Sequence, residues 1–218
     1  YVAVFYVLWG MSNTLADIPY WSMIPSFATE EKDRNFISSS GAKAGQDIIM
    51  TKWAAIEGTS IIANDYEDKL AETMDKAEIA EAKKLAELIS VVKEGRIAAD
   101  FGATAMHDAT EGGIFGAVWE VAECSGTGLE LYADKIPVLE CTRKICNAAG
   151  VNLYRLISSG TMIITTFDGE KLVAQLKESG VNAAIIGKIT ESGRYVIAGG
   201  ERKELVPQEK DEIYNVFK

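Results

Sequence analysis

The sequence predicts a layered α/β or α+β domain. From residue 46 onward, short runs of apolar and β-branched residues alternate with segments whose apolar residues recur every three or four positions. Glycines stand at many of the junctions between these segments. Alternating strands and helices of this kind build a sheet that helices cover. With 218 residues, 48% of them hydrophobic, the chain is long enough for one full domain or two small ones.

The first predicted elements lie in residues 46–94. The run "QDIIMTKW", residues 46–53, follows a glycine-containing turn and predicts a strand. The next segment, "AAIEGTSIIAND", predicts a short helix or a turn. Residues 65–94 predict one long helix with Gly95 just after its last turn. Its apolar residues lie at helical spacing: Leu70, Met74, Ala77, Ala80, Leu85, Leu88 and Val92.

The remaining elements follow in regular alternation. Gly150 and Gly180 stand where two of the predicted helices should stop. Pro207 stands at the first turn of the last predicted helix, where its missing N–H costs nothing. The strands are predicted at 102–108, 128–134, 161–167, 182–189 and 194–199, and the helices at 112–124, 139–149, 169–179 and 207–217.

The first 28 residues differ from the rest of the chain. They contain no Lys or Arg and one charge, Asp17, and they are long enough to cross a bilayer as a helix. Pro19 and Pro25 would kink or end that helix. The alternative is a buried or interfacial helix of a soluble fold. The serine- and glycine-rich run at 38–41 predicts a boundary between a hydrophobic segment, 1–40, and a domain, 41–218.

This segment contains a distinctive sequence, "YVLWGMSNTLADIPYWSMIPSFATEEKDRNFISS". It resembles one transmembrane helix and the following loop of the glycoside–pentoside–hexuronide:cation symporters. The resemblance implies that Asp17 belongs to a sugar/cation site and that Trp21 lies near the sugar. A carrier needs about a dozen helices around its site, so residues 1–39 would be a remnant or a fused fragment. The alternative function is a truncated symporter-type membrane protein with a soluble tail.

Charge and cysteine content exclude several functions. The net charge of −10 argues against nucleic acid as a partner, because phosphate backbones select basic surfaces. An acidic domain can still bind a nucleotide through backbone N–H groups, a local cation or a bridging Mg2+. The three cysteines form no CxxC pair and there is one histidine, which argues against a usual zinc site. Reduced, buried or partly buried thiols in the cytoplasm are expected instead.

The stretch "MHDATEGGIFGAVWEVAE" contains the most informative turn. Thr110 or Asp108 can cap the helix that follows, and Gly112 and Gly113 let a ligand approach the backbone. The N–H groups and the helix dipole would then bind an anion such as a phosphate. Asp108 and Glu111 would repel a bare phosphate, and a Mg2+ ion between carboxylate and phosphate resolves this conflict. The alternative is that the acids only cap the helix and the glycines only permit tight packing.

Three further features could contribute to the same site. His107 is either a hydrogen-bonded structural residue or a functional one. Ser158, Ser159 and Gly160 form a second small-residue turn that could bind a ligand, or a plain turn. Lys52 ends the first strand, where it could meet a phosphate or simply face solvent. Neither GxxxxGK[ST] nor GxGxxG occurs in the sequence.

Four stretches in order resemble one known domain: "GQDIIMTKWAAIEGTSIIA", "MHDATEGGIFGAVWEVAECSGTGLEL", "IPVLECTRKICNAAGVNLYRLISSGTMIIT" and "IGKITESGRYVIAGG". They look like the C-terminal domain of the AIR (aminoimidazole ribonucleotide) synthase-related superfamily, in the branch similar to the hydrogenase maturation protein HypE. The resemblance implies a mixed sheet covered by helices, ATP and Mg2+ as cofactors, and a cytoplasmic homodimer. It also implies that Asp108, Thr110, Glu111, Gly112 and Gly113 form one binding turn and "LISSG" a second.

Two departures from this family limit what is expected of the chain. The family's N-terminal domain, which carries most of the ATP and Mg2+ ligands, is replaced here by the symporter-like stretch. HypE ends in a cysteine that carries the modified group, whereas this sequence ends "IYNVFK". The chain is therefore expected to be an incomplete enzyme without HypE's cyanide-forming chemistry. Membrane attachment is expected only if residues 1–28 are a genuine anchor.

Overall fold

The computed structural model describes residues 38–218, which form one compact unit. The predicted hydrophobic helix and the symporter-like segment, residues 1–28 and 1–39, fall almost wholly outside the described residues. Among the residues that are described, no helix is long and apolar enough to cross a membrane.

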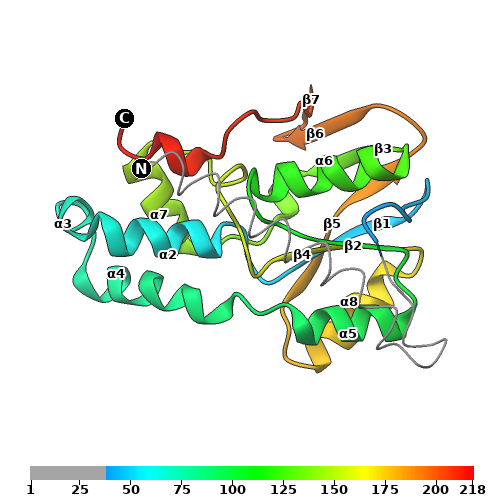
Figure 1. Ribbon diagram of the computed structural model, residues 1–218, viewed down its shortest axis with the longest axis horizontal. Helices are drawn as coiled ribbons and strands as arrows, with labels where there is room; N and C mark the ends of the chain where they lie inside the picture. The colour runs from blue at the N-terminus through cyan, green and yellow to red at the C-terminus, as the bar shows by residue number, and fades with distance from the viewer. Residues whose placement is uncertain (1–37) are drawn as a thin grey trace, which may run out of the picture. The chain divides into compact units, whose positions relative to one another are not determined.

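A seven-stranded mixed sheet forms the centre of the fold, in the order β2-β4-β1-β5-β3-β6-β7 (Figure 1). Neighbouring strands are antiparallel except β3 and β6, which are parallel. The layered α/β architecture with a mixed sheet is therefore confirmed. The strands are β1 Asp47–Thr51, β2 Ala105–Asp108, β3 Gly128–Tyr132, β4 Met162–Thr166, β5 Ala183–Thr190, β6 Arg194–Ala198 and β7 Glu201–Glu204.

Helices cover both faces of the sheet because its central strands are apolar on both sides. Ile48 and Met50 of β1 pack in one apolar cluster with helix α6, Gly113–Ser125. Ile49 points the other way and packs in a cluster with α5, Val92–Phe101, and α8, Gly169–Glu178. Successive strand residues face opposite sides, so this assignment follows from the pleat.

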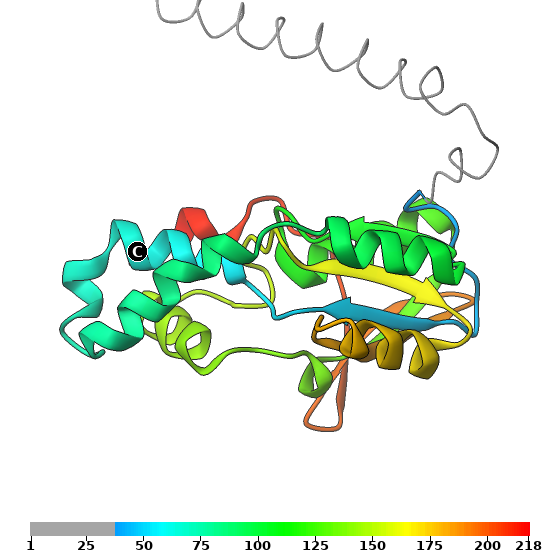
Figure 2. The same ribbon diagram turned by 90° about the horizontal axis from the view of Figure 1, so that it is seen from below.

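A cluster of helices forms a lobe beyond one end of the sheet, as Figure 2 shows. Ile62, Leu70, Ile79 and Ile145 are fully or almost fully buried in its core. The lobe contains α2 Ile56–Asp65, α3 Glu67–Leu70, α4 Lys76–Lys83, the 3-10 turn η2 Lys84–Leu88 and α7 Glu140–Ala149. A further short turn, η3 Ala133–Lys135, follows β3.

The prediction of one helix over residues 65–94 is wrong. The chain turns after α3 and starts again at Asp75, which forms a capping box with Glu78 at the beginning of α4. Gly95 lies inside α5, where the Met162 side chain packs against its backbone. Gly102, with φ of 89°, ends α5 instead. Of the seven residues whose spacing predicted one helix, only Leu70, Met74 and Leu85 are buried, and the other four are exposed.

The prediction of a last helix over 207–217 is also wrong. Only η4, Glu212–Asn215, forms a single 3-10 turn there. Residues 205–211 contain no helix or strand, and Asp211 is buried and bonded to distant segments. Strand β7 was not predicted because its sequence, "ERKE", is wholly exposed and has no apolar alternation.

Candidate functional site

The two turns predicted to bind a ligand lie against each other. Asp108 at the end of β2 pairs with Met162 at the start of β4, so the chain segments beyond these strand ends are neighbours. The Ala109 N–H donates to the Thr161 carbonyl at 2.8 Å, and the Ser158 N–H donates to the Thr110 carbonyl at 3.3 Å. The structure thus places residues 107–113 and 158–160 side by side, at the junction of the sheet and the helical lobe.

Gly112 and Gly113 both adopt left-handed backbone conformations, with φ of 77° and 61°. A Cβ atom on Gly113 would lie 2.6 Å from the Leu156 carbonyl oxygen and 2.8 Å from that of Tyr154. Both oxygens belong to the backbone, so no change of side-chain rotamer can remove the clash. Close packing therefore requires glycine at position 113, as the alternative interpretation of this turn expected.

The N-terminus of α6 is not capped by the residues that the sequence predicted. Neither Thr110 nor Asp108 caps it through its side chain. Instead Asp211 Oδ2, from the C-terminal segment, accepts the Gly112 N–H at 2.7 Å. The Gly113 N–H donates to the Thr110 carbonyl at 3.1 Å. The Gly112 and Gly113 N–H groups, expected to face a ligand, are therefore bonded within the protein.

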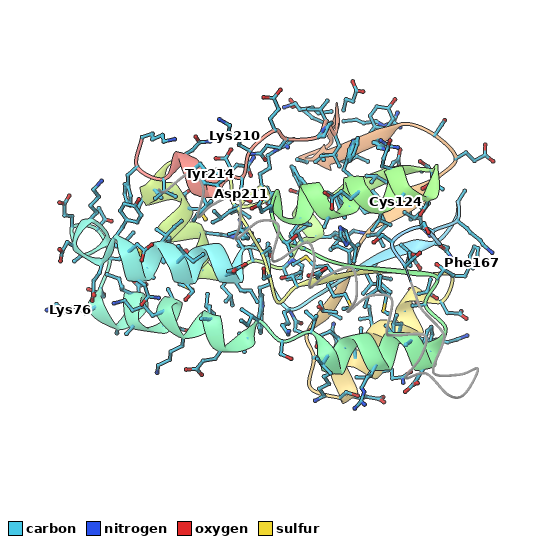
Figure 3. All side chains as sticks on the ribbon, viewed as in Figure 1. Lys76, Cys124, Phe167, Lys210, Asp211 and Tyr214 are labelled. Atoms are coloured by element: carbon cyan, nitrogen blue, oxygen red, sulfur yellow. The ribbon has the colours of Figure 1, made fainter. Side chains whose placement is uncertain are left out.

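Asp211 is the residue at this site that sequence reasoning missed. Its side chain is 3% exposed, and Figure 3 shows it next to Lys210, beside the start of α6. It lies 99 positions from Gly112 in the sequence. An aspartate before a short turn is a local signal for capping that turn, and nothing local indicates its contact with α6.

His107 lies on β2, an edge strand of the described sheet, between two carboxylates. Its Nε2 is 2.5 Å from Glu120 Oε2 of α6, and its Nδ1 is 3.9 Å from Asp108 Oδ1. All three side chains are partly exposed to solvent, His107 the least at 22%. The hydrogen-bonded histidine that was one of the two expectations is present, and its functional role stays a prediction.

The second turn, residues 158–160, is fixed by hydrogen bonds and close packing with other parts of the protein. Ser158 is fully buried, and its hydroxyl accepts the Ala55 N–H at 2.8 Å. The Ser159 N–H donates to Glu57 Oε2 at 3.2 Å. Gly160 has φ of 97°, and a Cβ there would lie 2.6 Å from Ile89 Cα.

Lys52 lies beside this turn with its ammonium group surrounded by acceptors. Its Nζ donates to the carbonyl oxygens of Leu88, Ser90 and Gly160 at 2.6–2.9 Å. It also lies 2.6 Å from Glu94 Oε1, whose side chain is 1% exposed. Lys52 has a positive φ of 54°, a conformation that β-strand residues do not normally adopt. Lys52, a candidate ligand-binding residue, thus contacts the second candidate turn through the Gly160 carbonyl.

A hollow of about 190 Å3 opens between the glycine turn and the C-terminal segment. Glu111, Glu120, Glu209 and Asp211 make it acidic, and Lys210 is its one basic residue. Within residues 38–218, no three His, Cys, Asp or Glu side chains are grouped so that they could hold a metal ion. Asp108 and Glu111 offer the oxygen atoms that Mg2+ prefers, and the remaining ligands would have to come from the bound molecule or water.

Comparison with known proteins identifies the domain. Residues 43–200 match the family described as AIR synthase related protein, C-terminal domain. The chain belongs to this family. Both candidate turns lie within the matched residues, whereas Asp211 lies beyond them.

Relatives of this AIR synthase-related chain include proteins of hydrogenase maturation. It is 34% identical over 130 residues to a protein of Methanocaldococcus jannaschii named for hydrogenase expression/formation, covering 58% of this chain and 37% of that protein. It is 31% identical over 102 residues to the carbamoyl dehydratase HypE of Escherichia coli, covering 45% and 30%. The chain therefore spans about a third of the length of these relatives.

Solved structures share the fold. The E. coli HypE crystal structure superimposes with a TM-score of 0.67 at 21% identity, covering 82% of this chain and 55% of that one. The thiamine monophosphate kinase of Aquifex aeolicus superimposes with a TM-score of 0.58 at 16% identity, covering 78% and 55%. The AIR synthase C-terminal fold is thus common to proteins that carry different names.

Proposed function

We propose that this AIR synthase-related domain binds a nucleotide, with Mg-ATP as the first candidate, or another phosphorylated ligand, at its paired turns. The direct contact between residues 107–113 and 158–160 carries this proposal, because it joins two turns that are far apart in the sequence. Solved structures of similar fold include HypE in complex with ATP and a thiamine-monophosphate kinase with AMPPCP and TMP.

Each predicted residue takes a role that its surroundings permit. Asp108 and Glu111 are exposed and would share a Mg2+ ion with the phosphates. Thr110, also exposed, would offer its hydroxyl. His107 would orient the turn through its bond to Glu120. Lys52, Ser158, Ser159, Gly112, Gly113 and Gly160 would form the frame that holds the two turns.

The chemistry of the complete protein would be ATP-dependent phosphoryl transfer to an acyl oxygen. The part of this chain in that reaction is positioning and charge neutralisation. We propose that it acts as the C-terminal half of a HypE-like cytoplasmic enzyme, whose remaining ATP ligands come from another domain or chain. A homodimer is the assembly that we propose for it.

Thermal unfolding of the full chain with and without Mg-ATP tests this function. A ligand at 100 times its Kd should stabilise the native state by about 2.7 kcal/mol. The double variant Asp108→Asn/Glu111→Gln should lose the additional thermal stabilisation that Mg2+ provides. ATP in EDTA should stabilise this variant as much as it stabilises the native protein. Asp168→Asn, an exposed acid before α8, serves as the matched control.

Two results would contradict the proposal. One is a melting temperature that does not change at any Mg-ATP concentration up to several times cellular levels. The other is a double variant that responds to Mg-ATP as the native protein does, which would remove the two carboxylates from the site.

A further inference from the structure

The C-terminal segment crosses the site and is fixed at both ends. The Leu205 N–H donates to the Arg194 carbonyl at 2.8 Å, and the Phe217 N–H donates to the Ala149 carbonyl at 3.0 Å. Leu205 and Val216 are buried. Asp211 lies between these anchors and is itself buried, so the segment is packed into the fold on both sides of it.

The Asp211 carboxylate accepts three backbone N–H groups. Its Oδ2 accepts from Gly112 at 2.7 Å, and its Oδ1 accepts from Ile157 at 3.2 Å and from Ile213 at 2.8 Å. Gly112 belongs to the first turn, and Ile157 directly precedes Ser158 of the second. One side chain therefore connects both turns with the C-terminal segment. Its negative charge also faces the positive end of the α6 dipole.

This arrangement cannot be reproduced by the turns alone. Without Asp211, the Gly112 and Ile157 N–H groups would lose their acceptor at a half-buried position. An unpaired donor of this kind destabilises the conformation that exposes it, so the turns would rearrange. The same carboxylate also lines the hollow beside Glu111.

We propose that Asp211 is a positioning residue of the ligand site. It fixes the positions of Gly112 and Ile157, and through them the exposed side chains of the first turn that would meet the ligand. This inference rests on the proposed function and assigns the C-terminal segment, which lies outside the family match, to the site.

Mg-ATP affinity, measured by calorimetry on the folded full chain well below its melting temperature, tests this role. Asp211→Ala should weaken binding by about tenfold or more, because the Gly112 and Ile157 N–H groups of the two turns lose their acceptor. Asp211→Asn keeps one acceptor oxygen and should fall between the native protein and Asp211→Ala. Asp134→Ala removes a carboxylate that accepts the Gly199 N–H at 2.9 Å and should bind within twofold of the native protein.

A second control separates positioning from general loss of stability. Leu172→Ala removes a fully buried side chain of α8 from the cluster on the other face of the sheet. It lowers the melting temperature but should leave the affinity within twofold. A folded Asp211→Ala protein that binds as tightly as the native protein, or more tightly, overturns the inference. Tighter binding would show that the carboxylate occupies the ligand's own place.

If the native protein binds no Mg-ATP, hydrogen exchange of the ligand-free protein still tests whether Asp211 positions the two turns. Exchange in the segments 109–117 and 153–161 should accelerate together by about tenfold in Asp211→Asn, and little elsewhere. This result would support the positioning role while the absence of binding overturned the proposed function. Unchanged exchange in either segment would overturn the positioning role itself. The Asn variant is used here because it keeps most of the native contacts.

Discussion

Gly113 is a residue of the site that leaves no room for a side chain. Two carbonyl oxygens, of Tyr154 and Leu156, occupy the space where its Cβ would be. Its φ of 61° adds a conformational cost for any other residue. Gly126 ends the same helix with φ of 65°, and no atom lies within 4 Å of a Cβ built there. The two glycines share a conformation and differ in their surroundings.

Gly113→Ala should therefore lower the free energy of unfolding by about 2–4 kcal/mol, from overpacking and left-handed strain together. Gly126→Ala should lower it by about 1 kcal/mol, from the strain alone. Urea denaturation of both variants measures the difference. Equal losses would mean that the loop at 154–156 yields easily, and that packing does not fix the glycine turn.

At the scale of an element, the helical lobe depends on where the chain restarts after α3. The capping box of Asp75 and Glu78 supplies hydrogen bonds to N–H groups that α4 cannot satisfy itself. Ile79 and Ala82 of α4 are buried in the lobe, so this start sets the direction in which they point. A local polar signal thus divides a segment whose apolar periodicity is continuous.

Asp75→Ala should cost about 1 kcal/mol of stability, the usual effect of removing an N-cap. Glu72→Ala, in the exposed turn just before it, should change stability by less than half as much. Urea denaturation compares the two. If Asp75→Ala were as harmless as Glu72→Ala, the division of residues 65–94 would have to come from packing alone.

At the scale of the whole molecule, the three cysteines are free and report on different parts of the fold. Cys124 is exposed on α6, whereas Cys141 and Cys146 are buried on α7. The expectation of buried or partly buried thiols thus holds for two of them. Burial raises the pKa of the Cys146 thiol to about 12, and the nearby Cys141 adds to this effect. Burial also raises the pKa of Cys141, with Glu81 contributing.

A disulfide reagent at pH 8 should therefore label Cys124 in the native protein and reach Cys141 and Cys146 only after unfolding. The folded pKa of Cys146 lies above its ordinary value of 9.0, so its contribution to stability is complete below about pH 9. That contribution is lost as the pH rises toward 12. Mass spectrometry of the labelled protein measures which thiols react. Unfolding at several pH values measures the loss of stability. Rapid labelling of all three thiols would show that the lobe opens readily.

Much of this fold follows from the sequence, because its signals are local. The alternation of Ile48, Ile49 and Met50 between two apolar clusters is the pattern of a strand buried on both faces. Gly150 and Gly180 follow their helices with φ of 72° and 79° as predicted. The two candidate turns were also recognised by their small and polar residues. The family resemblance also associates them in one site.

Tertiary structure alone decided how that site is held together. Asp211 lies 99 positions from Gly112 and 54 positions from Ile157, and no periodicity or turn preference relates them. The hydrogen bond from Lys52 to Gly160 joins residues that are even farther apart in the sequence, at 108 positions. The absence of a final helix has the same origin, because a buried carboxylate bonded to two other segments overrides local helix propensity. Local preferences determined most elements of this protein, whereas contacts between distant residues removed the last predicted helix and determined which ends of the elements meet.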